Sequence, residues 1–170
     1  MTLPSVESLI EKLTQALTPY FSSPQHQPII VGIETGGVWI AEHLLQRVNP
    51  GAELGRLNIS FYRDDFTKTG LHPTVKPSSL PGSIDDKTII LVDDVLHSGR
   101  TIRAAMNEIF DYGRPQKIVL VILVDRGDRE IPIQPDIVGT SIELDSDCHI
   151  KLEGPESLKF VIKTLGSHAK

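Results

Sequence analysis

Short apolar runs alternate with amphipathic segments along the chain, and this pattern predicts its secondary structure. Residues 28–33, 87–95 and 117–125 are rich in valine, isoleucine and leucine, which predicts three buried strands. Apolar residues recur at intervals of three and four in three further segments, which predicts helices over residues 6–17, 41–48 and 102–109. Strands that are apolar on both faces and alternate with helices predict an α/β domain whose central parallel sheet is covered on both sides.

Three other segments fit this pattern less clearly. Residues 54–63 indicate another strand, and residues 149–154 and 157–163 indicate a C-terminal hairpin, although a last helix would also fit the tail. Residues 64–86 form the longest stretch without periodicity, and they contain three prolines and two glycines. A loop this long inside a compact domain is usually functional or disordered, so a closing loop and a surface insertion both stay open.

Composition narrows the class of protein. The chain has 170 residues, enough for one domain with a substantial core, and 39% hydrophobic with 23% charged residues is typical of a globular protein. A formal net charge of −5 gives no global basic field that would attract nucleic acid. The single cysteine, Cys148, excludes an internal disulfide and a site with several thiolates. Residues 1–13 lack a signal-peptide pattern and no apolar run could cross a bilayer, so we expect a cytoplasmic protein.

The clearest candidate for chemistry is the sequence ILVDDVLHSGRT, in which a buried strand runs into two adjacent carboxylates. We expect Asp93 and Asp94 at the rim formed by the carboxyl ends of the strands, where open parallel sheets bind ligands. Two like charges repel each other and lose hydration in a closed site. A pair of ribose hydroxyls, with or without Mg²⁺, would offset that cost.

The turn after the aspartates leads into a helix, and this arrangement suits an anion. Backbone N–H groups of residues 97–101 and the helix N-terminus behind them can bind a phosphate, with hydroxyls from Ser98 and Thr101 and close approach at Gly99. In the alternative interpretation the aspartates cap a helix and the rest is only a turn. The complete pattern favours a ribose 5-phosphate site, because each part then has a role.

The longer stretch TIILVDDVLHSGRT resembles the phosphoribosyl-pyrophosphate signature of the type I phosphoribosyltransferases. Together with FYRDDFT, LVDRGDREIPI and PDIVG, in the same order and at similar spacing, it resembles one subfamily, the pyrimidine operon attenuation regulators that are also uracil phosphoribosyltransferases. The likeness runs from about Ile30 to Gly139. It implies the type I phosphoribosyltransferase fold in a single domain, residues 1–170, with a small hood largely from residues 126–170.

The resemblance implies transfer of a phosphoribosyl group from phosphoribosyl pyrophosphate to uracil, giving UMP and pyrophosphate with Mg²⁺. Asp93 and Asp94 would hold the ribose hydroxyls and, through ribose and pyrophosphate, the metal. The other residues implied in phosphoribosyl pyrophosphate binding are Val95, Leu96, His97, Ser98, Gly99, Arg100 and Thr101. The residues implied in the pyrophosphate loop are Thr35, Gly36 and Gly37, and those that would meet the base are Arg126 and Val138. Arg63, with Asp64 and Asp65, would open a long loop that closes over the reacting groups and excludes water.

His97 bears on the identity of the base. Purine-specific relatives have an acid at this position and the subfamily usually has tyrosine, so the absence of a carboxylate argues against hypoxanthine and guanine. Histidine exchanges a proton near neutral pH, which makes His97 a candidate catalytic residue beside Asp93, Asp94 and Arg63. The alternative is that His97 only packs beside the phosphate.

Two features depart from the subfamily. Gly36 stands where the pyrophosphate loop typically has arginine, and its loss removes a bidentate ligand for oxyanions. The face that binds RNA in the subfamily is poor in basic residues here, because the first helix has only Lys12, and Gln134 and Thr140 replace a usual arginine and lysine. The basic residues left for such a patch are Arg47, Arg56, Arg114, Lys117, Arg126 and Arg129.

Three functions therefore stay open after the sequence alone. The first is a uracil phosphoribosyltransferase, which the sugar and phosphate motifs support. The second is an RNA-binding regulator that responds to UMP through the same pocket, and the two roles are compatible. The third is a phosphoribosyltransferase for another base. The resemblance also implies a homo-oligomer without giving the number of subunits.

Overall fold

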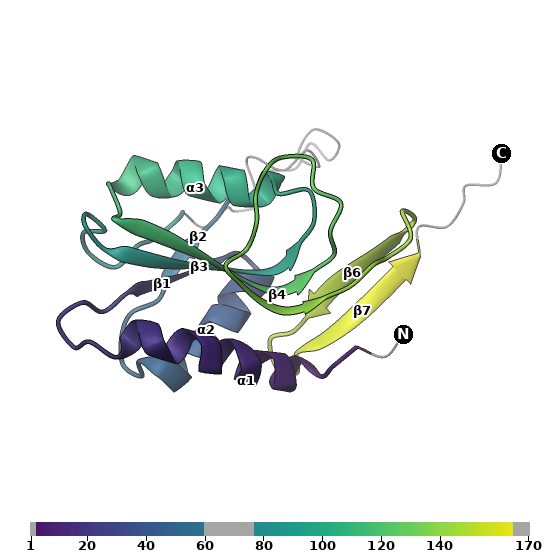
Figure 1. Cartoon of the computed structure of the whole chain (residues 1–170), viewed down its shortest axis with the longest axis horizontal. Coiled ribbons are helices and arrows are strands. Elements are labelled where there is room, and N and C mark those ends of the chain that lie inside the picture. The colour runs from purple at the N-terminus through teal and green to yellow at the C-terminus, as the bar shows by residue number, and fades with distance from the viewer. Residues whose placement is uncertain (1–2, 60–76, 165–170) are drawn as a thin grey trace.

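Five parallel strands form the central sheet, in the order β2-β1-β3-β4-β5 (Figure 1). The structure is a computed structural model that describes residues 3–59 and 77–164. The strands are β1 (Ile29–Ile33), β2 (Gly55–Leu57), β3 (Thr88–Leu96), β4 (Lys117–Asp125) and β5 (Ile137–Ser141). The order reverses between β1 and β3, since β2 is added at one side of β1 and the later strands at the other, as in doubly wound sheets.

Helices cover both faces of the sheet. They are α1 (Val6–Leu17), α2 (Gly36–Val48) and α3 (Arg100–Tyr112). The first two lie on one face and α3 lies on the other (Figure 1). In β3, Ile90 and Val92 pack with α1 and α2, whereas Ile89 and Leu91 pack with α3. Burial on both faces explains why these strands are continuous apolar runs.

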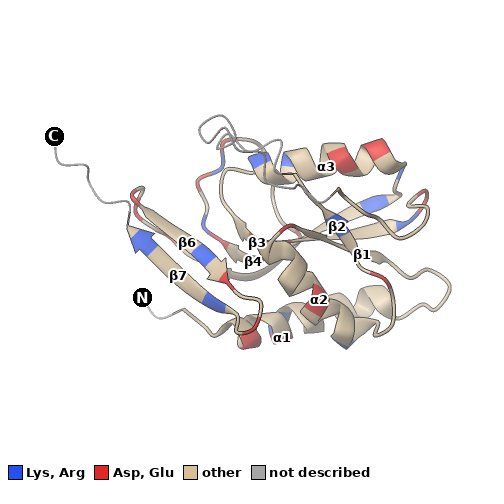
Figure 2. Ribbon diagram, turned by 180° about the vertical axis from the view of Figure 1, so that it is seen from behind, with Lys and Arg blue, Asp and Glu red and all other residues tan. Residues whose placement is uncertain are grey.

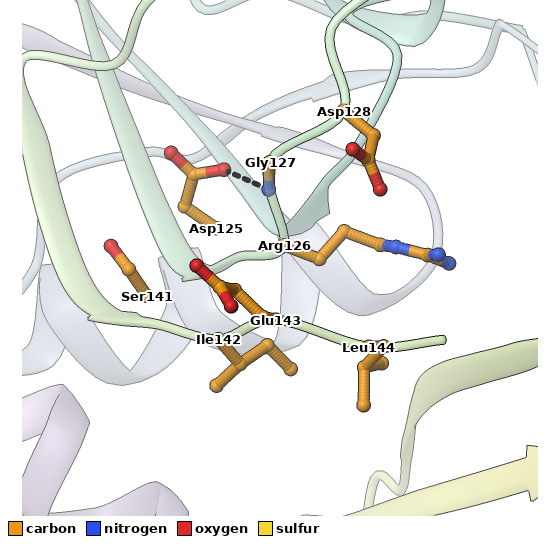
Figure 3. A pocket seen from close by; sticks show the side chains of 8 residues that line it. All are labelled: Asp125, Arg126, Gly127, Asp128, Ser141, Ile142, Glu143 and Leu144. Atoms are coloured by element: carbon orange, nitrogen blue, oxygen red, sulfur yellow. Dashed lines mark hydrogen bonds between the residues drawn. The ribbon is translucent and has the colours of Figure 1, made fainter. Parts of the chain in front are cut away.

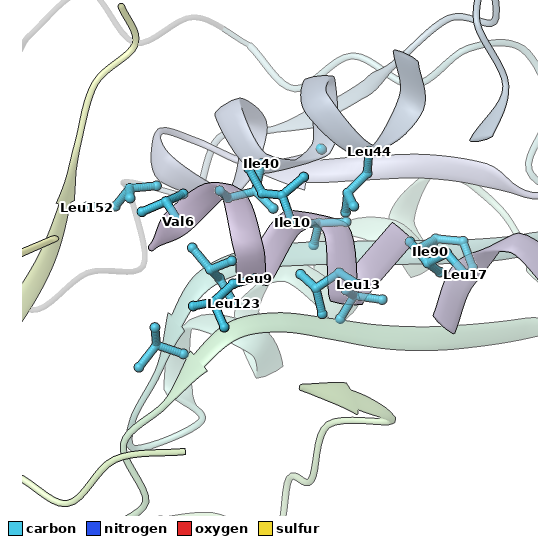
Figure 4. Close-up of a cluster of buried hydrophobic side chains, with 14 of the residues drawn as sticks. Val6, Leu9, Ile10, Leu13, Leu17, Ile40, Leu44, Ile90, Leu123 and Leu152 are labelled. Atoms are coloured by element: carbon cyan, nitrogen blue, oxygen red, sulfur yellow. The ribbon is translucent and has the colours of Figure 1, made fainter. Parts of the chain in front are cut away.

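Helix α1 packs through a single apolar face. The Oγ of Ser5 accepts a hydrogen bond from the N–H of Ser8 at 3.2 Å and caps the helix. The buried face consists of Val6, Leu9, Ile10, Leu13 and Leu17 (Figure 4). Nζ of Lys12 donates to the carbonyl of Gly139 at 2.5 Å, so α1 also contacts the edge strand β5.

A two-stranded antiparallel hairpin, which we call the hood, lies beyond the carboxyl ends of β3 and β4 (Figure 1). Its strands are β6 (Cys148–Glu153) and β7 (Lys159–Thr164). Ile150 and Leu152 of the hood are buried in the same apolar cluster as α1 and α2. At its turn, a Cβ on Gly154 would lie 3.0 Å from Cε3 of Trp39, so the indole of α2 packs directly against the hood backbone.

The predicted helices and buried strands are confirmed, and so is the hairpin in the tail, where 159–164 is strand rather than helix. Residues 137–141, within the range expected to supply the hood, instead pair with β4 in the main sheet. This edge strand is short and mostly half-buried, which leaves little periodic signal. Of the strand expected at 54–63, only Gly55–Leu57 is a strand, and residues 60–63 lie outside the described residues. Within the described ranges, no helix has the length and apolar character needed to cross a membrane.

Candidate active site

The adjacent aspartates lie where the strand order of the sheet reverses. β1 ends at Ile33, and its last partner in β3 is Val92, whereas β3 continues beside β4 as far as Leu96. Asp93 and Asp94 therefore follow directly after the last residue of β3 that pairs with β1, although β3 itself extends past them. Asp93 is only 4% exposed and its Oδ1 accepts a hydrogen bond from the N–H of Asp94 at 3.0 Å. Doubly wound sheets bind ligands at the point where the strand order reverses.

The loop that follows β1 approaches the aspartates closely. Helix α2 begins at Gly36, with Thr35 exposed at the N-cap. A Cβ on Gly36 would lie 2.3 Å from Oδ2 of Asp94, and a Cβ on Gly37 would lie 2.5 Å from the carbonyl oxygen of Val92. Neither position has room for a side chain. The N-terminus of α2 therefore lies against the Asp94 carboxylate, where its unpaired N–H groups attract anions.

A second helix N-terminus follows β3. We call residues 97–101 the phosphate loop, after the ligand that the sequence predicts for it. Within this loop, Gly99 is the N-cap of α3 and has a φ of +91°. A Cβ on Gly99 would also lie 3.0 Å from Cγ1 of Ile131, so both backbone conformation and space require glycine. The Oγ of Ser98 accepts a hydrogen bond from the N–H of Arg100 at 3.3 Å, and Thr101 lies in the first turn of α3. The aspartate pair is thus contacted by one anion-attracting helix end and followed by another.

A cavity of about 770 Å³ opens at the carboxyl ends of β4 and β5 (Figure 3). Its lining residues are Asp125, Arg126, Gly127, Asp128, Ser141, Ile142, Glu143 and Leu144. Arg126 is only 5% exposed, and its Nη1 donates to the carbonyl of Cys148 at 3.2 Å. Its Nε is buried and has no hydrogen-bond partner among the described residues. A buried donor without a partner costs free energy, and an acceptor oxygen on a ligand could satisfy it.

The two residues implied for the base lie in different places. Arg126 lines the cavity, whereas Val138 lies inside β5 opposite Ile122 and is not among the lining residues. Asp125 was not predicted from the sequence, although it follows a run of apolar residues in the same way as Asp93, and that signal would have identified it. Residues 141–144 carry no such signal, because they line the cavity only through the pairing of β5 with β4.

His97 has a lowered pKa in this site. Burial is the largest cause, and the positive charge of Arg126 acts in the same direction, while Asp128 and Glu130 oppose it. The pKa therefore lies below the ordinary 6.5, which leaves the imidazole neutral at pH 7. A neutral ring can accept a proton, as a general base requires.

The remaining predicted catalytic residue, Arg63, lies outside the described residues. The same is true of Asp64 and Asp65, and of the long loop up to residue 76. The predicted closing loop therefore stays a prediction.

The aspartate pair suits Mg²⁺ in the chemistry of its donors. Mg²⁺ prefers hard oxygen ligands and is usually held by one or two carboxylates together with phosphates of the substrate. Among the described residues, three potential ligands come within 4.8 Å of one another only at Asp145, Asp147 and Cys148. That exposed group includes a thiol, which Mg²⁺ does not favour. Asp93 and Asp94 would therefore need oxygens from the substrate to complete a magnesium site.

Contacts within the chain occupy the six basic residues that the sequence left for an RNA-binding patch. The contacts are Arg47 with Glu7, Arg56 with Glu42, Arg114 with the Phe110 carbonyl, Lys117 with the Tyr20 ring, Arg126 with the Cys148 carbonyl, and Arg129 with Asp125. Lys12 is likewise bound to a carbonyl of β5. Exposed lysines do occur on the hood, at positions 151, 159 and 163 (Figure 2).

Known proteins resemble this chain over nearly its full length. A profile of the phosphoribosyl transferase domain matches residues 3–157. Proteins named bifunctional protein PyrR are 49% identical in Pseudomonas aeruginosa, over 98% of this chain and 99% of the relative, and 49% identical in Nitrosococcus oceani, over 94% and 92%.

Solved structures share the fold at lower identity. A hypoxanthine-guanine phosphoribosyltransferase from Bacillus anthracis superposes with a TM-score of 0.65 at 23% identity, covering 84% of this chain and 83% of that one. A purine phosphoribosyltransferase from Pyrococcus horikoshii gives a TM-score of 0.61 at 24% identity, covering 81% and 83%. These likenesses confirm the predicted fold class.

Proposed function

Because the chain belongs to the phosphoribosyl transferase domain family and, within it, to the family of bifunctional PyrR proteins, we propose that it transfers a phosphoribosyl group from phosphoribosyl pyrophosphate to uracil. The products are UMP and pyrophosphate. The observation that carries the proposal is the aspartate pair at the strand-order reversal, contacted by the N-terminus of α2 and followed by that of α3.

The phosphoribosyl ligand fits this arrangement along its length. Asp93 and Asp94 accept hydrogen bonds from the ribose hydroxyls, and residues 95–101 receive the 5-phosphate at the N-terminus of α3. Pyrophosphate lies at residues 35–37, where the N-terminus of α2 stabilises the charge that develops as it leaves. Asp93 and Asp94, together with oxygens of the substrate, would hold Mg²⁺, and a bound metal would supply positive charge that stabilises the leaving pyrophosphate.

The base binds in the cavity at the ends of β4 and β5. In the reaction, N1 of uracil bonds to the anomeric carbon, the bond from that carbon to pyrophosphate breaks, and the proton on N1 is released. The unpaired Nε of Arg126 supports binding of a carbonyl oxygen of uracil. Val138 supports the cavity through β5, and the neutral ring of His97 is the candidate acceptor for the proton.

The first experiment is an assay of UMP formation from uracil and phosphoribosyl pyrophosphate with Mg²⁺. The unaltered protein is compared with an Asp93→Asn, Asp94→Asn double variant and with Asp111→Asn, which alters an exposed carboxylate on α3. We expect turnover to fall at least about 100-fold in the double variant and to be unchanged in the control. Circular dichroism checks that both variants fold. Turnover with hypoxanthine or another base in place of uracil would instead identify a different phosphoribosyltransferase.

A second role, binding of an RNA hairpin in response to UMP, is supported by the shared name of the relatives, which describes them as bifunctional. Lys151 and Lys163 of the hood are exposed and are the candidate contacts for RNA, whereas Lys159 pairs with Glu153 at 3.7 Å. Fluorescence anisotropy of a labelled RNA hairpin, with and without UMP, tests this role. Binding that UMP does not change would contradict it. The homo-oligomeric state and the cytoplasmic location stay predictions.

A further inference from the structure

Three consecutive carbonyl groups at the junction of β3 and the phosphate loop are held by the segment after β4. The carbonyls of Leu96 and Ser98 accept hydrogen bonds from backbone N–H groups of residues 126–131, at 3.0 to 3.3 Å. Between them, the carbonyl of His97 accepts a hydrogen bond from Nη1 of Arg129 at 3.0 Å. The Leu96 and Ser98 carbonyls are bound by backbone N–H groups, so only the hydrogen bond to the His97 carbonyl depends on a side chain.

Holding a carbonyl also fixes the N–H group that follows it. In a trans peptide the C=O and the next N–H point in opposite directions, because the peptide unit is planar. The bond between His97 and Ser98 is trans. A His97 carbonyl held toward Arg129 therefore turns the N–H of Ser98 to the side opposite residues 126–131, where it is free to bind the phosphate.

Each of the three nitrogens of the Arg129 guanidinium donates a hydrogen bond in this region. Its Nε donates to the carbonyl of Ile133 at 2.9 Å, and Nη1 also donates to the carbonyl of Gly127 at 3.2 Å. Nη2 pairs with Oδ2 of Asp125 at 2.7 Å, and the two side chains are only 14% and 15% exposed. The forked guanidinium thus connects three parts of the site: the end of β4, residue 127 in the segment that lines the cavity, and the phosphate loop. A lysine ammonium, a point charge, could not reproduce these directions.

The partner carboxylate stays ionised in this buried position. Burial alone would raise the pKa of Asp125, but hydrogen bonds from Arg129 and from the N–H of Gly127 outweigh it and lower the pKa below its ordinary value. The ion pair is therefore intact at neutral pH and keeps the guanidinium in place.

We propose that Arg129 is a positioning residue: through the His97 carbonyl it orients the phosphate loop and so sets the affinity of the protein for the 5-phosphate of its ligand. Arg129 does not touch the ligand itself in this role. The inference rests on the proposed function, since it requires a phosphoribosyl ligand in the loop. It also gives Arg129 a role in the interior of the site, away from any RNA-binding surface.

The test uses three variants and one control. Arg129→Met removes the fork and leaves the buried Asp125 unpaired, so it also destabilises the fold. The Asp125→Asn, Arg129→Met double variant removes both charges and recovers stability, yet still lacks the hydrogen bond to His97. Arg129→Lys keeps the charge without the fork. Arg47→Met is the control, because Arg47 also combines an ion pair and a carbonyl contact, but on α2.

The readouts separate positioning from stability. Calorimetry measures the Kd of ribose 5-phosphate, which carries the phosphate but no base, and thermal melting measures stability. We expect both methionine variants to bind ribose 5-phosphate about 10-fold more weakly than the unaltered protein, as loss of a charged hydrogen bond implies, with Arg129→Lys intermediate and the control unchanged. In the UMP assay, the KM for phosphoribosyl pyrophosphate should rise in parallel while kcat stays within about threefold.

Two results would overturn the inference while the proposed function stands. One is unaltered affinity in Arg129→Met, and the other is recovery of affinity together with stability in the double variant, which would make the role of Arg129 merely structural. If the unaltered protein binds no ribose 5-phosphate, the proposed function fails and the inference fails with it.

Discussion

At Gly36, the absence of a side chain lets Asp94 lie against the N-terminus of α2. The subfamily typically has arginine here, so the sequence suggested a lost ligand for pyrophosphate. The structure adds a second consequence, because a Cβ at this position would lie 2.3 Å from Oδ2 and 3.0 Å from Cβ of Asp94. The whole carboxylate would have to move to admit any side chain. Glycine at position 36 and the observed position of Asp94 therefore depend on each other.

Restoring the arginine should for this reason reduce activity. We expect both Gly36→Ala and Gly36→Arg to raise the KM for phosphoribosyl pyrophosphate about 10-fold, since each displaces the carboxylate proposed to hold the ribose. Steady-state assays at fixed Mg²⁺, with melting curves to check folding, measure the effect. Activity of Gly36→Arg above that of the unaltered protein would show that the guanidinium matters more than the position of Asp94.

His97 makes a specific contribution to the pH dependence of stability. Its pKa in the folded protein lies below the ordinary 6.5, so on acidification the unfolded chain takes up a proton at this residue before the folded protein does. The stability that the folded protein gains from keeping His97 neutral is fully present above pH 6.5. It is lost as the pH falls through the pKa that His97 has in the folded protein. We expect the free energy of unfolding to decrease less in His97→Asn than in the unaltered protein between about pH 7.5 and pH 5.5. Urea titrations at the two pH values measure this, and equal decreases would contradict the shift.

At the residue scale, the sequence predicts chemistry where it is local. Asp93, Asp94 and the phosphate loop are contiguous, so their joint site could be inferred without coordinates. The contact between Gly36 and Asp94 joins residues far apart in the chain, and so does the bond from Arg129 to His97. No periodicity or motif in the sequence predicts either of these two contacts. Both depend on how β1, β3 and β4 pair.

At the scale of elements, helix α1 shows directly how its sequence determines its packing, because one face of the helix is apolar and buried. Leu13 is fully buried between the sheet and α2 (Figure 4), whereas Gln15 on the same helix is exposed. Leu13→Ala should lower the free energy of unfolding by about 2–5 kcal/mol, because it leaves a cavity that the surrounding side chains cannot fill. Gln15→Ala is the matched control and should change it by less than about 0.5 kcal/mol. Chemical denaturation followed by circular dichroism measures both, and similar losses in the two variants would contradict this packing.

Helices and strands with a clear pattern of apolar residues could be predicted from the sequence. A strand that forms only because another strand offers it a partner could not. β3 and β4 are apolar on both faces, so their runs are unbroken and easily recognised. β5 is a strand because β4 offers it an unpaired edge and α1 binds its Gly139 carbonyl through Lys12. Neither partner is visible in the five residues of β5, which explains why this segment was expected in the hood.

At the scale of the whole molecule, acidic and basic residues are distributed along the helices, strands and loops (Figure 2). Four of the described arginines, Arg47, Arg56, Arg100 and Arg129, form ion pairs with carboxylates. The proposed ligand would bridge the molecule, since its phosphate lies at α3 and its base at the ends of β4 and β5. Ligand binding and folding should therefore be linked.

UMP should stabilise the entire domain. A ligand that binds only the folded state, at 100 times its Kd, adds about 2.7 kcal/mol to the free energy of unfolding. We expect the melting temperature to rise with UMP in the unaltered protein and to respond little in the Asp93→Asn, Asp94→Asn variant. Differential scanning calorimetry over a range of UMP concentrations measures this. A rise of equal size in both proteins would place UMP away from the aspartates.

The contact between Trp39 and the turn of the hood has a practical consequence. Trp39 is the only tryptophan of the chain, and its ring lies against Gly154 of the hood while its backbone belongs to helix α2, which begins at Gly36. Indole emission responds to the polarity around the ring, so the protein carries one intrinsic optical probe at the seam between hood and sheet. A shift of that emission would report separation of the two parts directly, in real time and without any label.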